Sequence, residues 1–387
     1  MTTSRETLFP VILVVSTLVS ACGSGASPTR QVPVGPTAPS GTTGGSSGTV
    51  TLTAPTPVSP VNNEQLSTLR PTLTVQNGTS SVQSGTRTYE FQVSDRTDFS
   101  MGASLTASFL VAVNQTGVPE GDGRTSFAVP SDLQPTTRMY WRSRVVQGTT
   151  SSDWSSPAMF RTKMVGYNRA NELYDPLVHG ETIGQIFGSV TFVTGRGAQL
   201  NTQTSYIRYQ LANTLTSGEF SVLVEGLAPG APGSKFKIFS MQSGTGNLIA
   251  NPYMSNVQYR GAIDGNPDNS ISFKALYGNF NDNRKFEPSS ANRLVRLLDP
   301  SRAYFWKWTW GSEVRLLVQE GIGGGTVYNF GVPTAGTYAP SPHYAYLGAN
   351  TQGQVPFEEG SRPGAIIRQV WISDKPRPTT LGNALEE

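Results

Sequence analysis

The chain has 387 residues, of which 14% are charged and 10% aromatic, with 41 Gly, 27 Pro, one Cys and two His. The low share of charged residues and the presence of many aromatic ones exclude a disordered chain. A net charge of +3 without basic runs excludes a nucleic-acid-binding footprint. The single Cys excludes a disulfide framework and a thiolate metal site. Gly, Pro, Ser, Thr and aromatic residues in this mixture indicate many short strands in two or three domains.

The N-terminus is expected to be an export signal. Residues 8–19 form an apolar run that is too short to span a hydrocarbon core of roughly 30 Å, and it fits the h-region of a secretory signal. The motif Val19-Ser20-Ala21-Cys22 follows, and it resembles the lipobox of bacterial lipoproteins. The resemblance implies removal of residues 1–21, lipid attachment at Cys22 and anchoring in the bacterial cell envelope. Gly23 resembles signals sorted to the outer membrane or cell surface. An ordinary signal peptide, in which Cys22 has no role, is the alternative.

Residues 22–50 are expected to be a tether. They are rich in Gly, Ser, Thr and Pro, a composition that buries too little apolar surface to offset the entropy of ordering. As a flexible coil such a segment spans roughly 30 Å. Residues 44–48 (GGSSG) match the G-x-S-x-G nucleophile pattern, but no strand pattern precedes them and no helix pattern follows. We therefore expect no catalytic Ser here.

Residues 51–163 are expected to form the first folded domain. Turn signals recur between short alternating runs at residues 72–75, 89–93 and 140–145, which is typical of an all-β sandwich. The order of these runs, followed by Asp153-Trp154-Ser155-Ser156-Pro157, resembles fibronectin type III domains of bacterial surface proteins. The resemblance implies a spacer or adhesion module. We expect Trp141 and Trp154 to serve in packing and not as a ligand platform.

Residues 170–376 are expected to form a second, larger all-β domain. Nine or more strands over this length suit a two-sheet jelly roll, and residues 292–298 are a candidate for a single helical turn or short helix. Residues 377–387 follow as a polar tail. The predicted strands are residues 185–193, 205–211, 219–227, 236–241, 270–277, 302–310, 314–320, 344–348 and 365–372.

Three Trp residues alternate along one predicted strand. Trp306, Trp308 and Trp310 share one face, and the register of the next strand decides which face is buried. A two-residue loop sets Trp308 opposite Arg315. A three-residue loop sets the three Trp opposite aliphatic residues, namely Val314, Leu316 and Val318. It leaves polar residues on the solvent-facing side, namely Lys307, Thr309 and Arg315. The second register separates apolar from polar side chains better, so we expect the Trp residues in the core and not in a sugar-stacking platform.

Several strands of this segment carry a family resemblance. They are residues 205–209 (SYIRY) with 218–222 (GEFSV), the hairpin at 304–321, and residues 344–349 with 364–372. Together they resemble the concanavalin A-like lectin/glucanase superfamily, which includes laminin-G domains. The fold class is thus all-β, with a fibronectin III-like β-sandwich followed by a concanavalin A-like jelly-roll sandwich. The resemblance implies recognition of a glycan or glycosylated partner on a concave face or loop rim, in some members with Ca²⁺.

The sequence lacks the catalytic patterns of enzymes with this fold. Laminarinase-type members place carboxylates as Glu-x-Asp-x-x-Glu on one strand; no segment matches, and Glu358-Glu359 would point in opposite directions. Alginate-lyase-type members use Gln-Ile-His and a Phe-Lys-Ala strand ending in Tyr. This chain has Gln185-Ile186-Phe187, which lacks the His, and a partial match at residues 273–277. His179 or His343 as a substitute base keeps a lyase open as an alternative.

Signals for metal binding are weak. Residues 264–269 (DGNPDN) begin like a Ca²⁺ loop, but Asn269 replaces the sharp-turn Gly and Ala275 stands where a bidentate Glu would fall. We expect an Asx/Pro turn and no metal or cofactor, with Ca²⁺ as the weak alternative. The Gly-rich residues 321–325 are expected to be a turn, since no βαβ unit surrounds them.

These observations favour a surface-anchored lipoprotein that binds carbohydrate or a glycosylated partner without catalysis. The partners are then a polysaccharide or glycoprotein and a membrane reached through the N-terminal lipid, with no nucleic acid. One alternative is a polysaccharide lyase or glycoside hydrolase with an atypical site, and another is a structural or adhesive envelope protein that binds protein. Residues that combine aromatic rings with cations near polar loops are the candidate ligand contacts, namely Tyr259, Arg260, Lys274, Tyr277 and Tyr344.

Overall fold

The chain folds as strands throughout the part that the structure describes. Its only helices there are two 3₁₀ turns, Ser290–Asn292 and Asn383–Leu385, and none is long and apolar enough to cross a membrane. The all-β prediction is confirmed. Cys22 lies outside the described residues. The computed structural model describes residues 49–100, 109–228, 235–245, 255–260, 270–277, 284–334, 338, 340–350 and 360–386.

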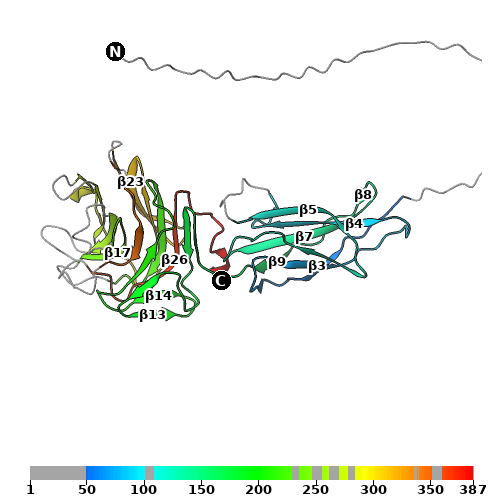
Figure 1. Ribbon diagram of the computed structural model, residues 1–387, viewed down its shortest axis with the longest axis horizontal. Helices are drawn as coiled ribbons and strands as arrows, with labels where there is room; N and C mark the ends of the chain where they lie inside the picture. Colours follow the sequence, from blue (N-terminus) through cyan, green and yellow to red (C-terminus); the bar gives the residue numbers. More distant parts are fainter. Residues whose placement is uncertain are drawn as a thin grey trace, which may run out of the picture. The chain divides into compact units, whose positions relative to one another are not determined.

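Strands β1 to β9 form a small sandwich of two sheets (Figure 1). The alternation that predicted the strands also fills the core, because Leu73, Val75, Phe91, Val93 and Trp141 all point inward and are buried. One sheet has the order β1 (Thr56–Ser59), β3 (Thr72–Gln76), β6 (Arg124–Ala128). The other has the order β2 (Glu64–Gln65), β9 (Ala158–Arg161), β7 (Arg138–Gln147), β4 (Arg87–Ser94), β5 (Ala112–Pro119), with β8 (Thr150–Ser151) paired to β7.

Both Trp residues of this sandwich are engaged in contacts within it. Trp141 is fully buried, and its Nε1 donates to the carbonyl of Pro60 at 2.8 Å. The guanidinium groups of Arg142 and Arg144 lie over the Trp154 ring, 4.7 and 4.6 Å from its centroid. Both Trp residues therefore serve in packing, as the sequence predicted.

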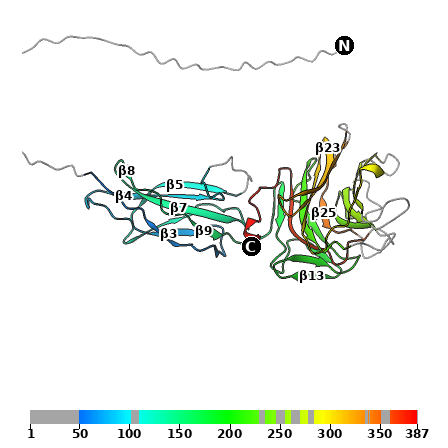
Figure 2. The ribbon, with the colours of Figure 1, turned by 180° about the vertical axis from the view of Figure 1, so that it is seen from behind.

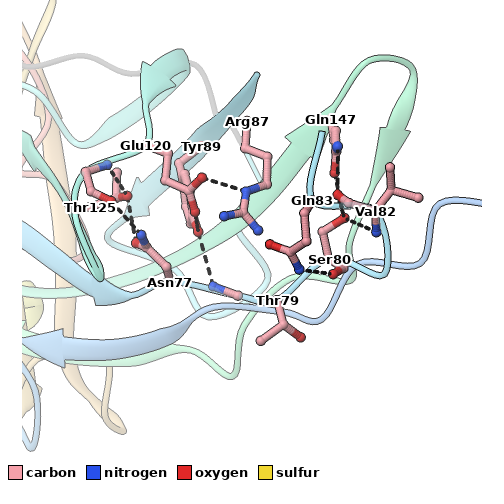
Figure 3. A network of polar contacts seen from close by, with 12 residues as sticks. Asn77, Thr79, Ser80, Val82, Gln83, Arg87, Tyr89, Glu120, Thr125 and Gln147 are labelled. Atoms are coloured by element: carbon pink, nitrogen blue, oxygen red, sulfur yellow. Dashed lines mark hydrogen bonds and ion pairs between the residues drawn. The ribbon is translucent and has the colours of Figure 1, made fainter. Parts of the chain in front are cut away.

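A polar network secures the segment that follows β3 (Figure 3). The Nδ2 of Asn77 donates to the carbonyl of Gly121, and its Oδ1 accepts from Thr125. The buried Tyr89 hydroxyl donates to Glu120, which also pairs with Arg87 at 2.6 Å. Burial raises the pKa of Tyr89 to about 12, so the phenol stays protonated at neutral pH. Because these groups satisfy one another, we assign the network to folding and not to ligand binding.

Strands β10 to β26 form a larger sandwich of two facing sheets (Figures 1 and 2). The first, here called the Trp sheet, has the order β10 (Tyr167–Arg169), β11 (Glu172–Asp175), β26 (Ile366–Ser373), β16 (Gly218–Glu225), β22 (Tyr304–Trp310), β23 (Glu313–Glu320), β24 (Thr326–Pro333), with β14 (Gly197–Leu200) paired to β26 and β13 (Val190–Val193) paired to β14. The second, here called the Tyr sheet, has the order β12 (Gln185–Phe187), β15 (Tyr206–Gln210), β25 (Tyr344–Leu347), β17 (Lys235–Gln242), β18 (Ser255–Arg260), β19 (Ser270–Tyr277), β20 (Arg284–Phe286), with β21 (Leu294–Val295) on β19. Phe220 of β16 meets Phe239 of β17 across the core at 4.4 Å between ring centroids.

The three-residue register of the Trp hairpin is confirmed. Trp306 pairs with Val318 and Trp308 with Leu316 across β22 and β23. All three Trp side chains of β22 are at most 4% exposed, so they belong to the core between the sheets. The Nε1 of Trp310 donates to the carbonyl of Leu215, whereas those of Trp306 and Trp308 have no hydrogen-bond partner within the described residues.

Two predicted elements of this sandwich are wrong. Residues 185–193 form two strands, β12 and β13, which belong to different sheets, because Gly188 turns the chain with φ of +72°. The helical turn predicted at residues 292–298 is instead the 3₁₀ turn Ser290–Asn292 followed by strand β21. The pairing of Leu294 with Ile271 of β19 adds this segment to the Tyr sheet. Tertiary pairing here overrides the local helical pattern.

The residues after β26 are packed against the Trp sheet. Leu381 is 2% exposed and clusters with Tyr174 and Trp371. Arg377 is half-buried beside them and donates to the carbonyls of Gln369 and Leu381. The polar composition of this segment thus coexists with a small apolar cluster that composition did not reveal.

Candidate functional site

The outward face of the Tyr sheet carries polar and aromatic side chains, of which Arg208 and Tyr344 are partly exposed and Tyr206 and Tyr346 are buried. Ile207 and Tyr209 of β15 are buried in the core, so Tyr206 and Arg208 between them point to the opposite side. The same alternation in β25 places Ala345 in the core and the neighbouring Tyr residues outside. The face is therefore a direct result of period-2 sequence patterns in strands that are far apart in the chain.

The strand register aligns these outward positions in one row. Arg208 pairs with Gln185 on one side and with Tyr346 on the other. Tyr346 in turn pairs with Ser240 of β17. The backbone of Asn256 in β18 continues the row to Lys274 in β19. The row thus crosses five interfaces between neighbouring strands and ends in a cation.

Arg208 is the centre of the cluster at the β12 edge of this row. It donates from a terminal nitrogen to Oε1 of Gln185 at 2.6 Å. Its guanidinium carbon lies 4.8 Å from the ring centroid of Phe187 and 5.6 Å from that of Tyr344. Aromatic rings on both neighbouring strands therefore hold the planar group in place without cancelling its charge.

Two further Tyr residues support the cluster. The Tyr206 ring stacks on Phe187 at 4.6 Å and meets Tyr346 edge-on at 5.8 Å. Both are buried, although they face away from the core between the sheets. Burial raises the pKa of each phenol, so neither Tyr206 nor Tyr346 is poised to act as a base near neutral pH.

A pocket of about 510 Å³ opens beside Arg208. Its size lies in the usual range for small-molecule sites. Arg208 is the one charged residue in its lining, which otherwise consists of amide, aliphatic and Tyr side chains, namely Asn168, Ile183, Gln185, Tyr209, Gln210, Leu211 and Ala212. The arrangement can receive a polar ligand and offers it hydrogen-bond donors, acceptors and one positive charge.

A smaller pocket of about 200 Å³ shares Ile183 with the first and is lined by Asp175. The Asp175 carboxylate is 2% exposed and accepts hydrogen bonds from the Thr182 hydroxyl, the Ile183 amide and the Tyr209 hydroxyl at 2.6, 3.1 and 3.0 Å. Burial raises the pKa of Asp175 to about 6 despite these donors. This carboxylate ties the segment after β11 to β15, beneath the wall of the larger pocket.

The structure places two of the five predicted ligand residues on the outward face of the Tyr sheet. Tyr344 lies within the Arg208 cluster. Lys274 lies on the same face in β19, three strands from β25 and hence roughly 14 Å away. The backbones of Tyr259 and Arg260 lie in β18 and that of Tyr277 in β19, and their side chains are outside the described part of the chain.

Several residues of the cluster are not among the ligand contacts that the sequence predicts. Arg208 and Tyr206 belong to the run Tyr206–Gln210, whose alternation already placed them on one face. In the sequence, Gln185 and Phe187 stand out only as part of a motif without its His. What the sequence could not show is that β12 and β25 flank β15.

His343 is exposed just before β25 and His179 lines the smaller pocket, so neither lines the pocket beside Arg208. Within the described residues, no three His, Cys, Asp or Glu side chains gather in a metal-binding group.

Comparison with known proteins shows similarity in fold only. No protein-family profile and no curated protein matches the chain. Among solved structures, the enzymatically active domain of tailspike protein 2 from bacteriophage CBA120 shares 9% identity at a TM-score of 0.36, covering 58% of this chain and 33% of its own. The Ca²⁺/Man2-bound exoplasmic/lumenal domain of VIP36 shares 10% at 0.35 (54% and 89%), and alginate lyase Aly36B in complex with alginate tetrasaccharide shares 12% at 0.24 (55% and 84%). The chain spans about a third of the tailspike's length.

Proposed function

We propose that this protein is a carbohydrate-binding protein whose site is the Arg208 cluster and the pocket beside it. The observation that carries the proposal is the pocket of about 510 Å³, which Arg208 and amide side chains line, with the ring of Tyr344 beside Arg208. Sugars present hydroxyl groups at their edges and apolar C–H groups on their faces. Side-chain amides suit the former, and the ring of Tyr344 suits the latter.

We propose binding without catalysis. The row and the pocket contain no Asp or Glu among their described residues, so they supply no pair of carboxyl groups for glycoside hydrolysis. The raised pKa of Tyr206 and of Tyr346 keeps both phenols protonated, which leaves them unsuited to abstract a proton as a lyase requires.

A glycan array probed with the full chain tests this function. We expect retention of at least one polysaccharide class, with no new reducing ends and no unsaturated uronate product. Product formation would establish the lyase or hydrolase alternative, and failure to retain any glycan would favour a structural or adhesive protein.

Tyr344→Ala should weaken glycan binding roughly three- to tenfold, since it removes an aromatic contact. Tyr140→Ala is the matched control, because Tyr140 is an outward Tyr of β7 in the first sandwich. Equal loss in both variants, measured by isothermal titration calorimetry, would argue against a site at the Arg208 cluster.

We further propose that the protein is held at the bacterial envelope by a lipid on Cys22, on the strength of the lipobox resemblance of residues 19–22. Cys22→Ser should abolish lipid labelling and release the chain from the membrane fraction. Ser20→Thr serves as a control that leaves the acylated residue in place. Unchanged membrane association and processing of Cys22→Ser would contradict the anchor.

A further inference from the structure

We infer that the pocket beside Arg208 selects acidic glycans, those that carry carboxylate or sulfate groups, over neutral ones. The inference rests on the proposed carbohydrate-binding function and concerns the ligand class of the same site. Its basis is a positive charge that the protein positions in a pocket and leaves without a counter-charge.

Arg208 differs in this respect from most other Arg residues with described contacts. Arg87, Arg144, Arg196 and Arg315 each pair with a Glu at 2.5 to 2.7 Å. In the described part of the chain Arg208 has no carboxylate partner; its contacts are Gln185, Phe187 and Tyr residues. The charge therefore stays available to a ligand.

The surroundings of Arg208 add geometric selectivity. One of its five N–H groups donates to Gln185, and the rings of Phe187 and Tyr344 pack against the guanidinium. A guanidinium can donate two parallel hydrogen bonds to the two oxygens of a carboxylate or sulfate, whereas a hydroxyl has a single oxygen and cannot form this bidentate pair. An acidic group thus gains more from this side chain than a hydroxyl does.

The pocket also contains nothing that would repel an anion. Its lining has no Asp or Glu. The Asp175 carboxylate, which accepts from the Tyr209 hydroxyl, is buried and satisfied by three donors. Lys274 lies at the far end of the same row, on the same face of the Tyr sheet.

The test compares polymers that differ only in charge. The full chain is titrated with polygalacturonate and with the same polymer after carboxyl reduction, and with dextran sulfate and dextran. Double-stranded DNA serves as a control, because it is a polyanion that contains no carboxylated or sulfated sugar. We expect binding of at least one acidic polymer at least tenfold tighter than its neutral partner, weakening with added salt, and no comparable binding of DNA through Arg208. The two pairs distinguish carboxylate from sulfate.

Arg208→Gln should lower the affinity for the acidic polymer roughly 10- to 100-fold, the range for loss of a charged hydrogen-bonding partner. Arg208→Lys keeps the charge but not the planar guanidinium, so its affinity for the acidic polymer should lie between those of the original chain and Arg208→Gln. Arg315→Gln is the matched control, since it removes the same net charge from the outward face of the Trp sheet. Thermal unfolding of each variant confirms that the fold is retained.

The outcomes separate this inference from the proposed function. Equal affinity for a neutral polymer and its acidic partner would overturn acid selection and leave carbohydrate binding in place. Binding of no polymer at all would overturn both. An equal loss of affinity in Arg315→Gln would show that net charge, and not the Arg208 site, causes the effect. DNA binding that depends equally on Arg208 would show that the site binds polyanions in general. Either result overturns the inference.

Discussion

Trp306→Ala will destabilise the protein by about 3–5 kcal/mol, the cost of removing a large aromatic side chain from a packed core. Trp306 is fully buried between Val222 and Val318, its neighbours on β16 and β23. The substitution leaves a cavity at the centre of the Trp sheet, which the flanking strands cannot close without breaking their register. Urea unfolding followed by circular dichroism measures the change.

The control for this prediction is Lys307→Ala, one residue along the same strand. Lys307 points to the outward face and is only partly buried, so its loss should change stability by less than about 1 kcal/mol. If both variants lose the same stability, the Trp residues are not the centre of the core.

Trp306→Phe separates packing from hydrogen bonding. The Trp306 Nε1 has no hydrogen-bond partner within the described residues, and a buried donor left unsatisfied costs about 1–3 kcal/mol. Phe removes this donor while it keeps an aromatic ring. We therefore expect Trp306→Phe to lose much less stability than Trp306→Ala.

Asp175→Asn will change how the stability of the protein depends on pH. Burial raises the pKa of Asp175 to about 6, so between pH 4 and 6 the folded state binds a proton that the unfolded state has released. The contribution of Asp175 to the free energy of unfolding consequently falls as pH rises through this window, by about 2 kcal/mol. The stability of Asp175→Asn relative to the original chain should increase by this amount between pH 4 and pH 7.

The groups around Asp175 do not obscure this result. Tyr209 donates to it and Tyr174 precedes it in β11, and burial raises the pKa of each phenol, so both stay neutral over this range. His179 and Glu181 line the same small pocket and are present in both proteins. Urea titrations at pH 4, 5, 6 and 7 give the difference, with the exposed Asp153→Asn as control. A difference that stays constant with pH would contradict the assignment.

Sequence patterns were most reliable where one strand face is buried. The Trp hairpin shows this: its register was chosen because it places Trp306 and Trp308 opposite Val318 and Leu316, and the structure has this pairing. Sequence patterns failed where local signals compete with tertiary pairing. Gly188 divides one apolar run between two sheets, and Leu294 joins the Tyr sheet instead of a helical turn.

The predicted ligand residues show the same limit. Tyr344 and Lys274 were selected for composition, and both lie on the outward face of the Tyr sheet. The partners that give Tyr344 a chemical context come from β12 and β15, more than 130 residues earlier in the chain. No local pattern indicates that Gln185, Arg208 and Tyr346 occupy adjacent strands, because sheet order depends on the packing of the whole sandwich.

The sequence by itself determined that this chain is all-β, which faces of its strands are apolar, and how the Trp hairpin is paired. These properties follow from period-2 alternation and turn residues, which act over a few positions. Only the tertiary structure decided which outward side chains meet and which charges remain without a partner. Arg208 has a pocket and no described carboxylate beside it, and Asp175 is buried beneath that pocket's wall, because β12, β15 and β25 became neighbours.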